Sequence, residues 1–180
     1  MISVSGKRAR VVLAVLLLST AGAQRRADPL NPLETDQLRD AAQEPSERLK
    51  LYIEFARTRL ASLEQMRADP KVTDRARQTH DRLQNFLDLY DEMNDNIDTF
   101  VERKADLRKP LKAVIEADTE FQAKLRALKS SLDANLDANK DEAKQYDFLL
   151  ASVLETVDSS LEDHRQLLRQ QEEAAKHKKK

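Results

Sequence analysis

The stretch that decides the fold is residues 83–100, LQNFLDLYDEMNDNIDTF. Large apolar side chains recur in it every three or four residues, and most positions between them are acids or amides. Because an α-helix turns once in 3.6 residues, this spacing gathers the apolar side chains on one face. The stretch therefore predicts an amphipathic helix whose buried face comprises Leu83, Phe86, Tyr90, Met93, Ile97 and Phe100.

The helix around this stretch is predicted to be long. It extends from the residues after Asp69 and Pro70, which end the preceding segment and are expected to cap this one, to about Arg108. At ~1.5 Å per residue, its roughly 37 residues span about 55 Å. Pro110 ends or kinks it, because proline lacks an amide donor and restricts Lys109 before it. A tight turn is favoured there, and a single kinked rod is the alternative.

Three further segments show the same helical spacing. One begins near Pro45, which suits a first helical position. A second follows Pro110, and the last runs from Asn139, which forms a capping-box pattern with Glu142, to about Glu173. Their apolar faces comprise Leu49, Tyr52, Ile53, Ala56, Leu60, Leu63 and Met66; Leu111, Val114, Ile115, Phe121, Leu125, Leu128 and Leu132; and Ala143, Tyr146, Leu150, Val153, Val157, Leu161, His164 and Leu168.

Four such faces cannot remain in contact with water. Burying even ten large apolar side chains contributes on the order of 20 kcal/mol before conformational entropy is subtracted. All eight Phe and Tyr residues lie in these segments, seven of them on or beside the apolar faces, and their expected role is to anchor the core. The sequence predicts an all-α protein, an elongated antiparallel helical bundle or coiled-coil-like assembly of about four helices after a cleaved signal peptide.

The first 23 residues have the pattern of a secretory signal peptide. A basic region precedes the apolar run VVLAVLLL at residues 11–18, and small residues follow it. The pattern predicts cleavage between Ala23 and Gln24 and export to the periplasm or the medium. The uncharged stretch at residues 11–23 is shorter than the roughly 20 residues that span a bilayer, so an uncleaved membrane anchor is the lesser alternative.

The chain after Gln24 divides by composition. Residues 24–45 contain Pro29, Pro32 and Pro45 and are interpreted as a linker, in which Thr35 could cap a short helix at residues 36–43. Residues 46–173 form the predicted bundle domain. Residues 174–180 form a basic C-terminal tail that includes Lys178, Lys179 and Lys180.

The residue types that are missing exclude several chemistries. There is no cysteine, and both glycines, Gly6 and Gly22, precede the predicted cleavage site. Thiol catalysis, disulfides and covalent haem attachment all need cysteine. Phosphate-binding loops and dinucleotide folds need glycine for close approach to the ligand. The sequence therefore predicts neither an enzyme nor a cofactor.

Two polar residues interrupt the apolar faces: Asp118 lies between Ile115 and Phe121, and His164 between Leu161 and Leu168. A buried carboxylate requires a partner, which an imidazole can provide. One interpretation makes Asp118 and His164 the lining of a small polar site. The favoured interpretation is a pair that sets helix register, or two residues at the edge of the apolar face.

The run Asp133, Asn135, Asp137, Asn139 and Asp141 resembles the start of a calcium-binding loop. Ala138 and Lys144 occupy the positions where such a loop needs glycine and a bidentate glutamate. A helix connection rich in capping side chains is the favoured interpretation, and no metal site is predicted.

The distribution of charge bears on partners. The formal net charge is −1, but without the predicted leader, Arg25, Arg26 and the C-terminal lysines the body carries 22 basic and 32 acidic residues. Such a body repels nucleic acid. The tail lysines offer a weak possibility of contact with an anionic membrane surface.

Exclusion of catalysis leaves interaction as the expected function. The sequence favours an exported, non-enzymatic protein that binds a protein partner or itself, or serves as a scaffold in the cell envelope. No small-molecule ligand is predicted. The alternative is a carrier or sensor bundle that binds a metal ion or small ligand between its helices, with Asp118 and His164 as the first residues to examine.

Overall fold

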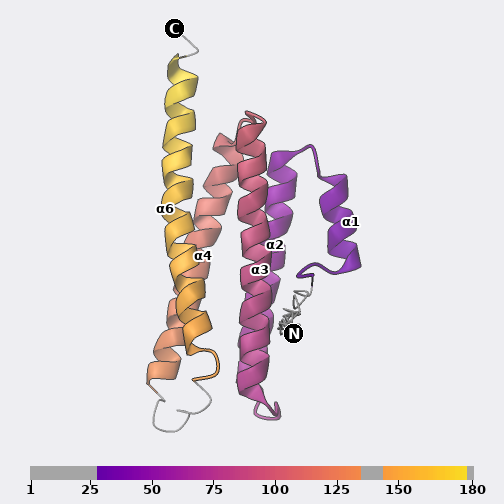
Figure 1. The fold of residues 1–180 in the computed structure, drawn as a ribbon, viewed down its shortest axis with the longest axis vertical. Coiled ribbons are helices and arrows are strands. Elements are labelled where there is room, and N and C mark those ends of the chain that lie inside the picture. Colours follow the sequence, from indigo (N-terminus) through magenta and orange to yellow (C-terminus); the bar gives the residue numbers. More distant parts are fainter. Residues whose placement is uncertain (1–27, 135–143, 178–180) are drawn as a thin grey trace, which may run out of the picture.

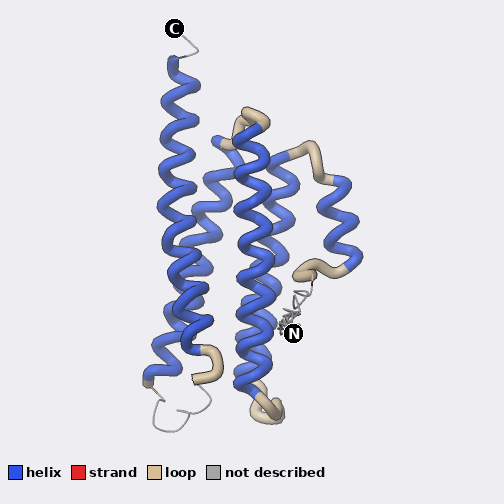
Figure 2. The backbone as a smooth tube through the Cα atoms, in the orientation of Figure 1, coloured by secondary structure: helices blue, strands red, loops and turns tan. Residues whose placement is uncertain are grey.

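The computed structural model describes residues 28–134 and 144–177, and all regular structure in this part of the chain is α-helical. Five helices pack against one another (Figure 1; Figure 2). They are α1 (Pro32–Asp40), α2 (Pro45–Ala68), α3 (Arg75–Glu102), α4 (Arg108–Asp133) and α6 (Asp147–His177). The predicted cleavage site at Ala23 and Gln24 and the predicted cap Asn139 lie outside the described residues.

Two helical hairpins make up most of the molecule. Successive helices run in opposite directions (Figure 1), and α2 packs most extensively on α3, as α4 does on α6. Where the two hairpins meet, helices that run in the same direction lie side by side: α2 is beside α4, and α3 is beside α6. Ion pairs confirm the parallel pairing of α2 and α4. Arg57 of α2 binds Glu120 of α4, and further along both helices in the same direction Glu64 of α2 binds Lys124 of α4. The molecule is therefore antiparallel within each hairpin and parallel between them.

The predicted apolar faces form the core. Phe86 and Tyr90 of α3 and Phe121 of α4 are fully buried, and the Phe86 and Phe121 rings meet edge to face with centroids 5.5 Å apart. Such pairs add to the free energy gained from burial alone. Seven of the eight aromatic side chains are buried, as expected of core anchors. Phe148 is 88% exposed, so the prediction was wrong for this residue: it lies on the outer face of α6.

A turn separates α3 from α4, as the favoured prediction has it. The alternative, a single helix kinked at Pro110, is wrong. α3 ends at Glu102, earlier than predicted, because Lys104 adopts a left-handed conformation with φ 58°. The amide of Ala105 then donates to the carbonyl of Phe100 (3.0 Å) and that of Lys104 to Val101 (2.9 Å), which closes the helix end. Pro110 lies in the first turn of α4, where its missing amide leaves no helical hydrogen bond unmade.

The other helix ends differ in detail from the prediction. Asp69 follows the last residue of α2 as expected, but Asp74, with φ 54°, precedes α3. α1 begins at Pro32, inside the predicted linker, and its cap is Asn31 rather than Thr35. The Asn31 side chain accepts from the Glu34 amide (3.0 Å), and the Glu34 carboxylate accepts from the Asn31 amide (2.9 Å). This reciprocal capping box explains the earlier start of α1.

The last helix continues to His177, beyond the predicted end near Glu173. Its C-terminal turns extend past the ends of the other helices (Figure 1). Among the described residues, no helix combines the length and the apolar character that crossing a bilayer would require.

Candidate functional site

The candidate site is a polar cluster inside the bundle, centred on Asp118 of α4. Asp118 is fully buried and His164 of α6 is 5% exposed. The His164 Nδ1 atom lies 2.8 Å from the Asp118 Oδ2 atom. The structure thus brings together the two residues that interrupt the apolar faces, across the hairpin that α4 and α6 form.

Tyr90 of α3 completes the coordination of the carboxylate. Its hydroxyl donates a hydrogen bond of 2.8 Å to Asp118 Oδ1. Burial raises the pKa of Tyr90 above its usual value of 10, and the adjacent Asp118 carboxylate raises this pKa further. The tyrosine therefore remains a neutral hydrogen-bond donor at any physiological pH. Both carboxylate oxygens of Asp118 are thereby bound by groups of the protein.

Ser160 and Asn94 extend the cluster along the seam between α3 and α6. Asn94 Nδ2 donates to Ser160 Oγ over 3.0 Å. Asn94 Oδ1 is buried and makes no hydrogen bond to any described group. Buried polar atoms usually have a partner, so this oxygen marks the least satisfied point of the cluster.

The geometry suits a structural role better than a catalytic one. Asp118 links α3, α4 and α6, and its hydrogen bonds fix how the two hairpins align. A catalytic or ligand-binding carboxylate needs an oxygen open to substrate, and neither oxygen of Asp118 is open. In the described ranges no three His, Asp or Glu side chains are placed to hold one metal ion.

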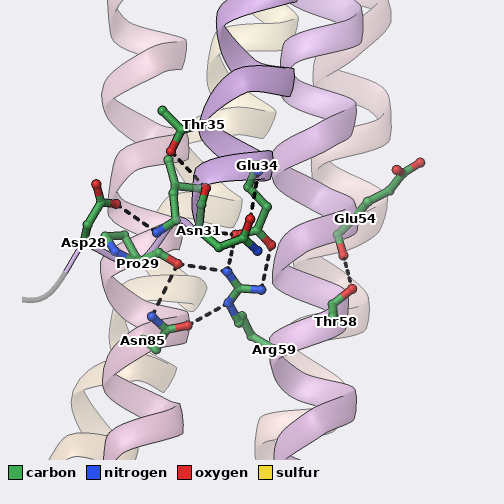
Figure 3. A network of polar contacts seen from close by, with 10 residues as sticks. Asp28, Pro29, Asn31, Glu34, Thr35, Glu54, Thr58, Arg59 and Asn85 are labelled. Carbon is green, nitrogen blue, oxygen red and sulfur yellow. Dashed lines mark hydrogen bonds and ion pairs between the residues drawn. The ribbon is translucent and has the colours of Figure 1, made fainter.

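A second network holds α1 to the bundle (Figure 3). The guanidinium of Arg59 in α2 binds both oxygens of Glu34, at 2.6 and 2.8 Å. It also donates to the carbonyl of Pro29 (2.9 Å) and to Asn85 of α3 (2.7 Å). Burial opposes ionisation of Glu34, but the hydrogen bonds from Arg59 and the Asn31 amide prevail and lower its pKa below 4.5. This group of contacts is called the α1 clamp below.

Arg48 fastens the other end of α1. It donates to the carbonyl of Leu38 and, over 2.6 Å, to Asn96 of α3, whose amide donates to the Tyr52 hydroxyl (2.9 Å). An open cavity of about 470 Å³ lies beside Arg48, between α1 and the first hairpin. Glu92 lines it, and burial together with Asp28 and Asp95 raises the pKa of this carboxyl group.

A second hollow lies at the end of the bundle where α4 begins and α6 ends. It has a volume of about 810 Å³ and opens widely to solvent. Its lining is mostly charged: Asp106, Arg108, Lys109, Lys112, Glu172 and Lys176, with Ser46, Pro110 and Ala175. This hollow is a surface feature, in contrast to the closed cluster at Asp118.

Sequence reasoning identified Asp118 and His164 because charge within an apolar face is conspicuous. It missed Tyr90, whose position on the apolar face was interpreted as core packing alone; the signal was its hydroxyl, which needs a partner when buried. It also missed Glu34 and Arg59, because nothing in the local pattern of either segment indicates the other. The calcium-like run begins at Asp133, and its members from Asn135 to Asp141 lie outside the described residues.

Comparison of the chain with protein-family models, with curated proteins and with solved structures finds no match.

Proposed function

We propose that this protein is an exported, non-enzymatic helical bundle that acts by macromolecular interaction or scaffolding in the cell envelope. In this proposal the leader at residues 1–23 is removed, and the mature protein is an elongated bundle with four long helices and the short α1. The periplasm or the medium is its place of action.

The observation that supports this proposal is the state of Asp118. Its two oxygens accept from Tyr90 and from His164, both within 2.8 Å, so the most chemically distinctive group in the core already serves the fold. The hollow at the end of α6 and the one beside α1 are, by contrast, open to solvent and have charged side chains in their linings. Because the core carboxylate is already bound within the fold, we infer that the protein functions through its surface.

Crosslinking in the source cells tests the proposal. The chain carries an affinity tag after its C-terminus, envelope proteins are crosslinked, and tagged complexes are identified by mass spectrometry. One or more partners, or a crosslinked homo-oligomer, should be enriched over a tagged exported control protein. Peptide mass spectrometry of the same material should find an N-terminal peptide that begins at Gln24 or at its pyroglutamate form. Recovery of the monomer alone would contradict the proposal, and an uncleaved leader would contradict its account of export.

The alternative, a carrier or sensor of a metal ion or small ligand, is favoured by one observation, the unpartnered buried oxygen of Asn94. A thermal-shift screen with divalent ions and haem distinguishes the two functions. Ligand at 100 times its Kd stabilises the folded state by about 2.7 kcal/mol, which raises Tm measurably. The interaction proposal predicts unchanged melting, and a shift that is lost in an Asn94→Ala variant would favour the carrier.

A further inference from the structure

Two segments far apart in the sequence, the first of them basic, meet at one end of the bundle. Residues 102–112 form the end of α3, the turn and the start of α4; residues 169–177 form the last turns of α6. Gln171 bridges them, because its side-chain oxygen accepts from the Leu107 amide over 2.8 Å. Lys112 and Glu172 join them again through an ion pair of 3.2 Å. We call this surface the basic end, with side chains Arg103, Lys104, Arg108, Lys109, Lys112, Arg169 and Lys176.

The basic end has more positive charge than its own acids can neutralise. Arg108 pairs with Asp106 and Lys112 with Glu172. Lys104, Lys109 and Lys176 are exposed and form no ion pair with any described residue. The two segments carry seven basic and four acidic side chains, and three further lysines follow directly in the sequence, which gives a net charge of +6.

The rest of the molecule is strongly acidic. From Gln24 onward the chain has a net charge of −4, so the part outside the basic end and its following lysines carries −10. The same end of the bundle also contains Glu44, which precedes α2, and Glu47 in the first turn of α2. The positive charge is therefore concentrated on the α4–α6 side of one end.

This charge distribution favours binding to a flat anionic surface. Along α3, 28 residues at ~1.5 Å each extend the acidic body to about 42 Å from that end. The Debye length at physiological salt is ~8 Å, so a plane touching only the basic end is screened from most of the acidic body. A long polyanion such as nucleic acid would run past the end and meet the acidic sides.

We propose that the basic end docks onto a membrane surface of anionic lipid headgroups, with the bundle standing end-on. The proposal rests on the envelope location given under the proposed function and names one partner for it. Long lysine side chains without a shaped apolar pocket suit headgroups, which offer charge but no fixed shape. The helix that extends furthest at that end, α6 (Figure 1), carries Lys176 in its last turn.

Vesicle cosedimentation of the protein as the cell processes it tests this docking. Vesicles contain phosphatidylglycerol mixed with phosphatidylcholine, or phosphatidylcholine alone. Binding to the anionic vesicles should be at least about tenfold tighter and should be lost at about 0.5 M salt, since the attraction is electrostatic. Equal binding to both vesicle types, or binding that survives high salt, would overturn the proposal.

Charge reversal localises the contact. Lys104, Lys109 and Lys176 are changed together to Glu, and the matched control changes Lys71, Arg77 and Lys144 to Glu at the opposite end. Each lysine near an anionic surface contributes on the order of fivefold in affinity, so the first variant should bind more than tenfold more weakly. The control should stay within about threefold of the unaltered protein, because its altered residues lie far from the surface. If vesicle binding weakens equally in both variants, the attraction depends on the total charge of the protein and not on the basic end, and the proposal is wrong.

Circular dichroism and a nucleic-acid competitor complete the design. Both variants should keep the helical spectrum, because all six side chains are exposed. A duplex DNA oligonucleotide should bind more weakly than the anionic vesicles; DNA binding without vesicle binding would contradict the membrane assignment. Crosslinking to a protein partner is measured separately, so failure of vesicle binding with a recovered partner would reject only the docking proposal.

Discussion

Asp118 is the residue on which the alignment of the two hairpins depends. Its carboxylate is fully buried and receives one hydrogen bond from α3 and one from α6. Buried charge is costly unless each oxygen is bound, and here each oxygen is bound. The residue therefore contributes more to a unique arrangement of helices than an apolar side chain of the same size would.

Replacing Asp118 with Ala should strongly destabilise the fold. The change leaves the Tyr90 hydroxyl and the His164 Nδ1 atom buried without their partner, so the free energy of unfolding should fall by about 3 kcal/mol or more. Urea denaturation followed by circular dichroism measures it. The control Asp98→Ala, on the exposed face of α3, should change this free energy by at most ~0.5 kcal/mol.

A fully apolar variant separates the role of the charge from that of packing. If Asp118, His164 and Tyr90 become Leu, Leu and Phe together, no polar group of this trio remains buried, and much of the lost stability should return. A single Asp118→Ala change with no effect on urea denaturation would show that the carboxylate is not buried as described.

Individual residues also show which structural features can be predicted from the sequence. The apolar faces predict which side chains enter the core, and this holds from Leu49 to Leu161 with few exceptions. Periodicity does not reveal which groups meet, because partners such as Tyr90 and Asp118 come from helices whose relative rotation is set by packing. Phe148 shows the converse limit, since an aromatic residue within a helix need not face the core.

Among the elements, α1 depends most on side-chain contacts for its position. It has nine residues, too few for a stable isolated helix in water, and Leu38 is its one buried apolar residue among those described. The α1 clamp supplies the remaining attachment. Its removal should therefore free α1 and leave the two hairpins folded.

A Glu34→Gln variant tests the clamp through its dependence on pH. Because the folded-state pKa of Glu34 lies below 4.5, the carboxylate stabilises the fold above that value, and this contribution is lost as pH falls through the folded-state pKa. The variant should lose about 2 kcal/mol of unfolding free energy near pH 7, and the difference should shrink at about pH 4 and below. Urea denaturation across this range measures it, and hydrogen exchange should show faster α1 amides.

The control for the clamp is Asp36→Asn, two residues further along and on the exposed side of α1. Asp36 pairs with Arg39 at 2.8 Å, but both side chains are more than half exposed, so the change should be at most ~0.5 kcal/mol. Equal losses in the two variants, or a difference for Glu34→Gln that does not change with pH, would contradict a clamp that depends on the carboxylate charge.

Helix ends were harder to predict than helix existence. Four long helices follow from periodicity, but their ends depend on single backbone conformations. Lys104 and Asp74 adopt positive φ angles. Lysine gives no signal of this conformation, and aspartate, although enriched at positive φ, is as common at helix caps and turns with negative φ. The Asn31 and Glu34 capping box, by contrast, is a local sequence pattern that can be recognised without the structure. The prediction that Thr35 caps this helix was wrong, because Asn31 is the cap.

At the scale of the whole molecule, the two hairpins lie with α3 and α6 parallel and in limited contact. The sequence predicts only that apolar faces are covered, because periodicity does not name the covering helix. An arrangement in which all neighbouring helices are antiparallel would satisfy the same apolar faces. The parallel pairing therefore needs its own test.

A short bismaleimide crosslinker can verify the pairing, because the chain has no native cysteine. Asn94 and Ser160 touch across the seam at 3.0 Å, so the variant with both changed to Cys should crosslink within one molecule. The control pair Asn94→Cys and Asp133→Cys joins positions in opposite halves of the bundle and should not. Intramolecular products run as monomers on denaturing gels, and peptide mass spectrometry identifies the linked sites. Crosslinking in the control alone would refute the parallel arrangement.

The left-handed conformation at Lys104 has a consequence for how the protein can evolve. A side chain with a Cβ atom is strained at this φ, and a Lys104→Gly change should stabilise the folded state by ~1 kcal/mol in urea denaturation. The same change would delete a cation from the surface proposed to meet the bilayer. Folding stability and membrane binding therefore favour different residues at position 104. Selection for membrane binding would keep lysine, although glycine would make the fold more stable.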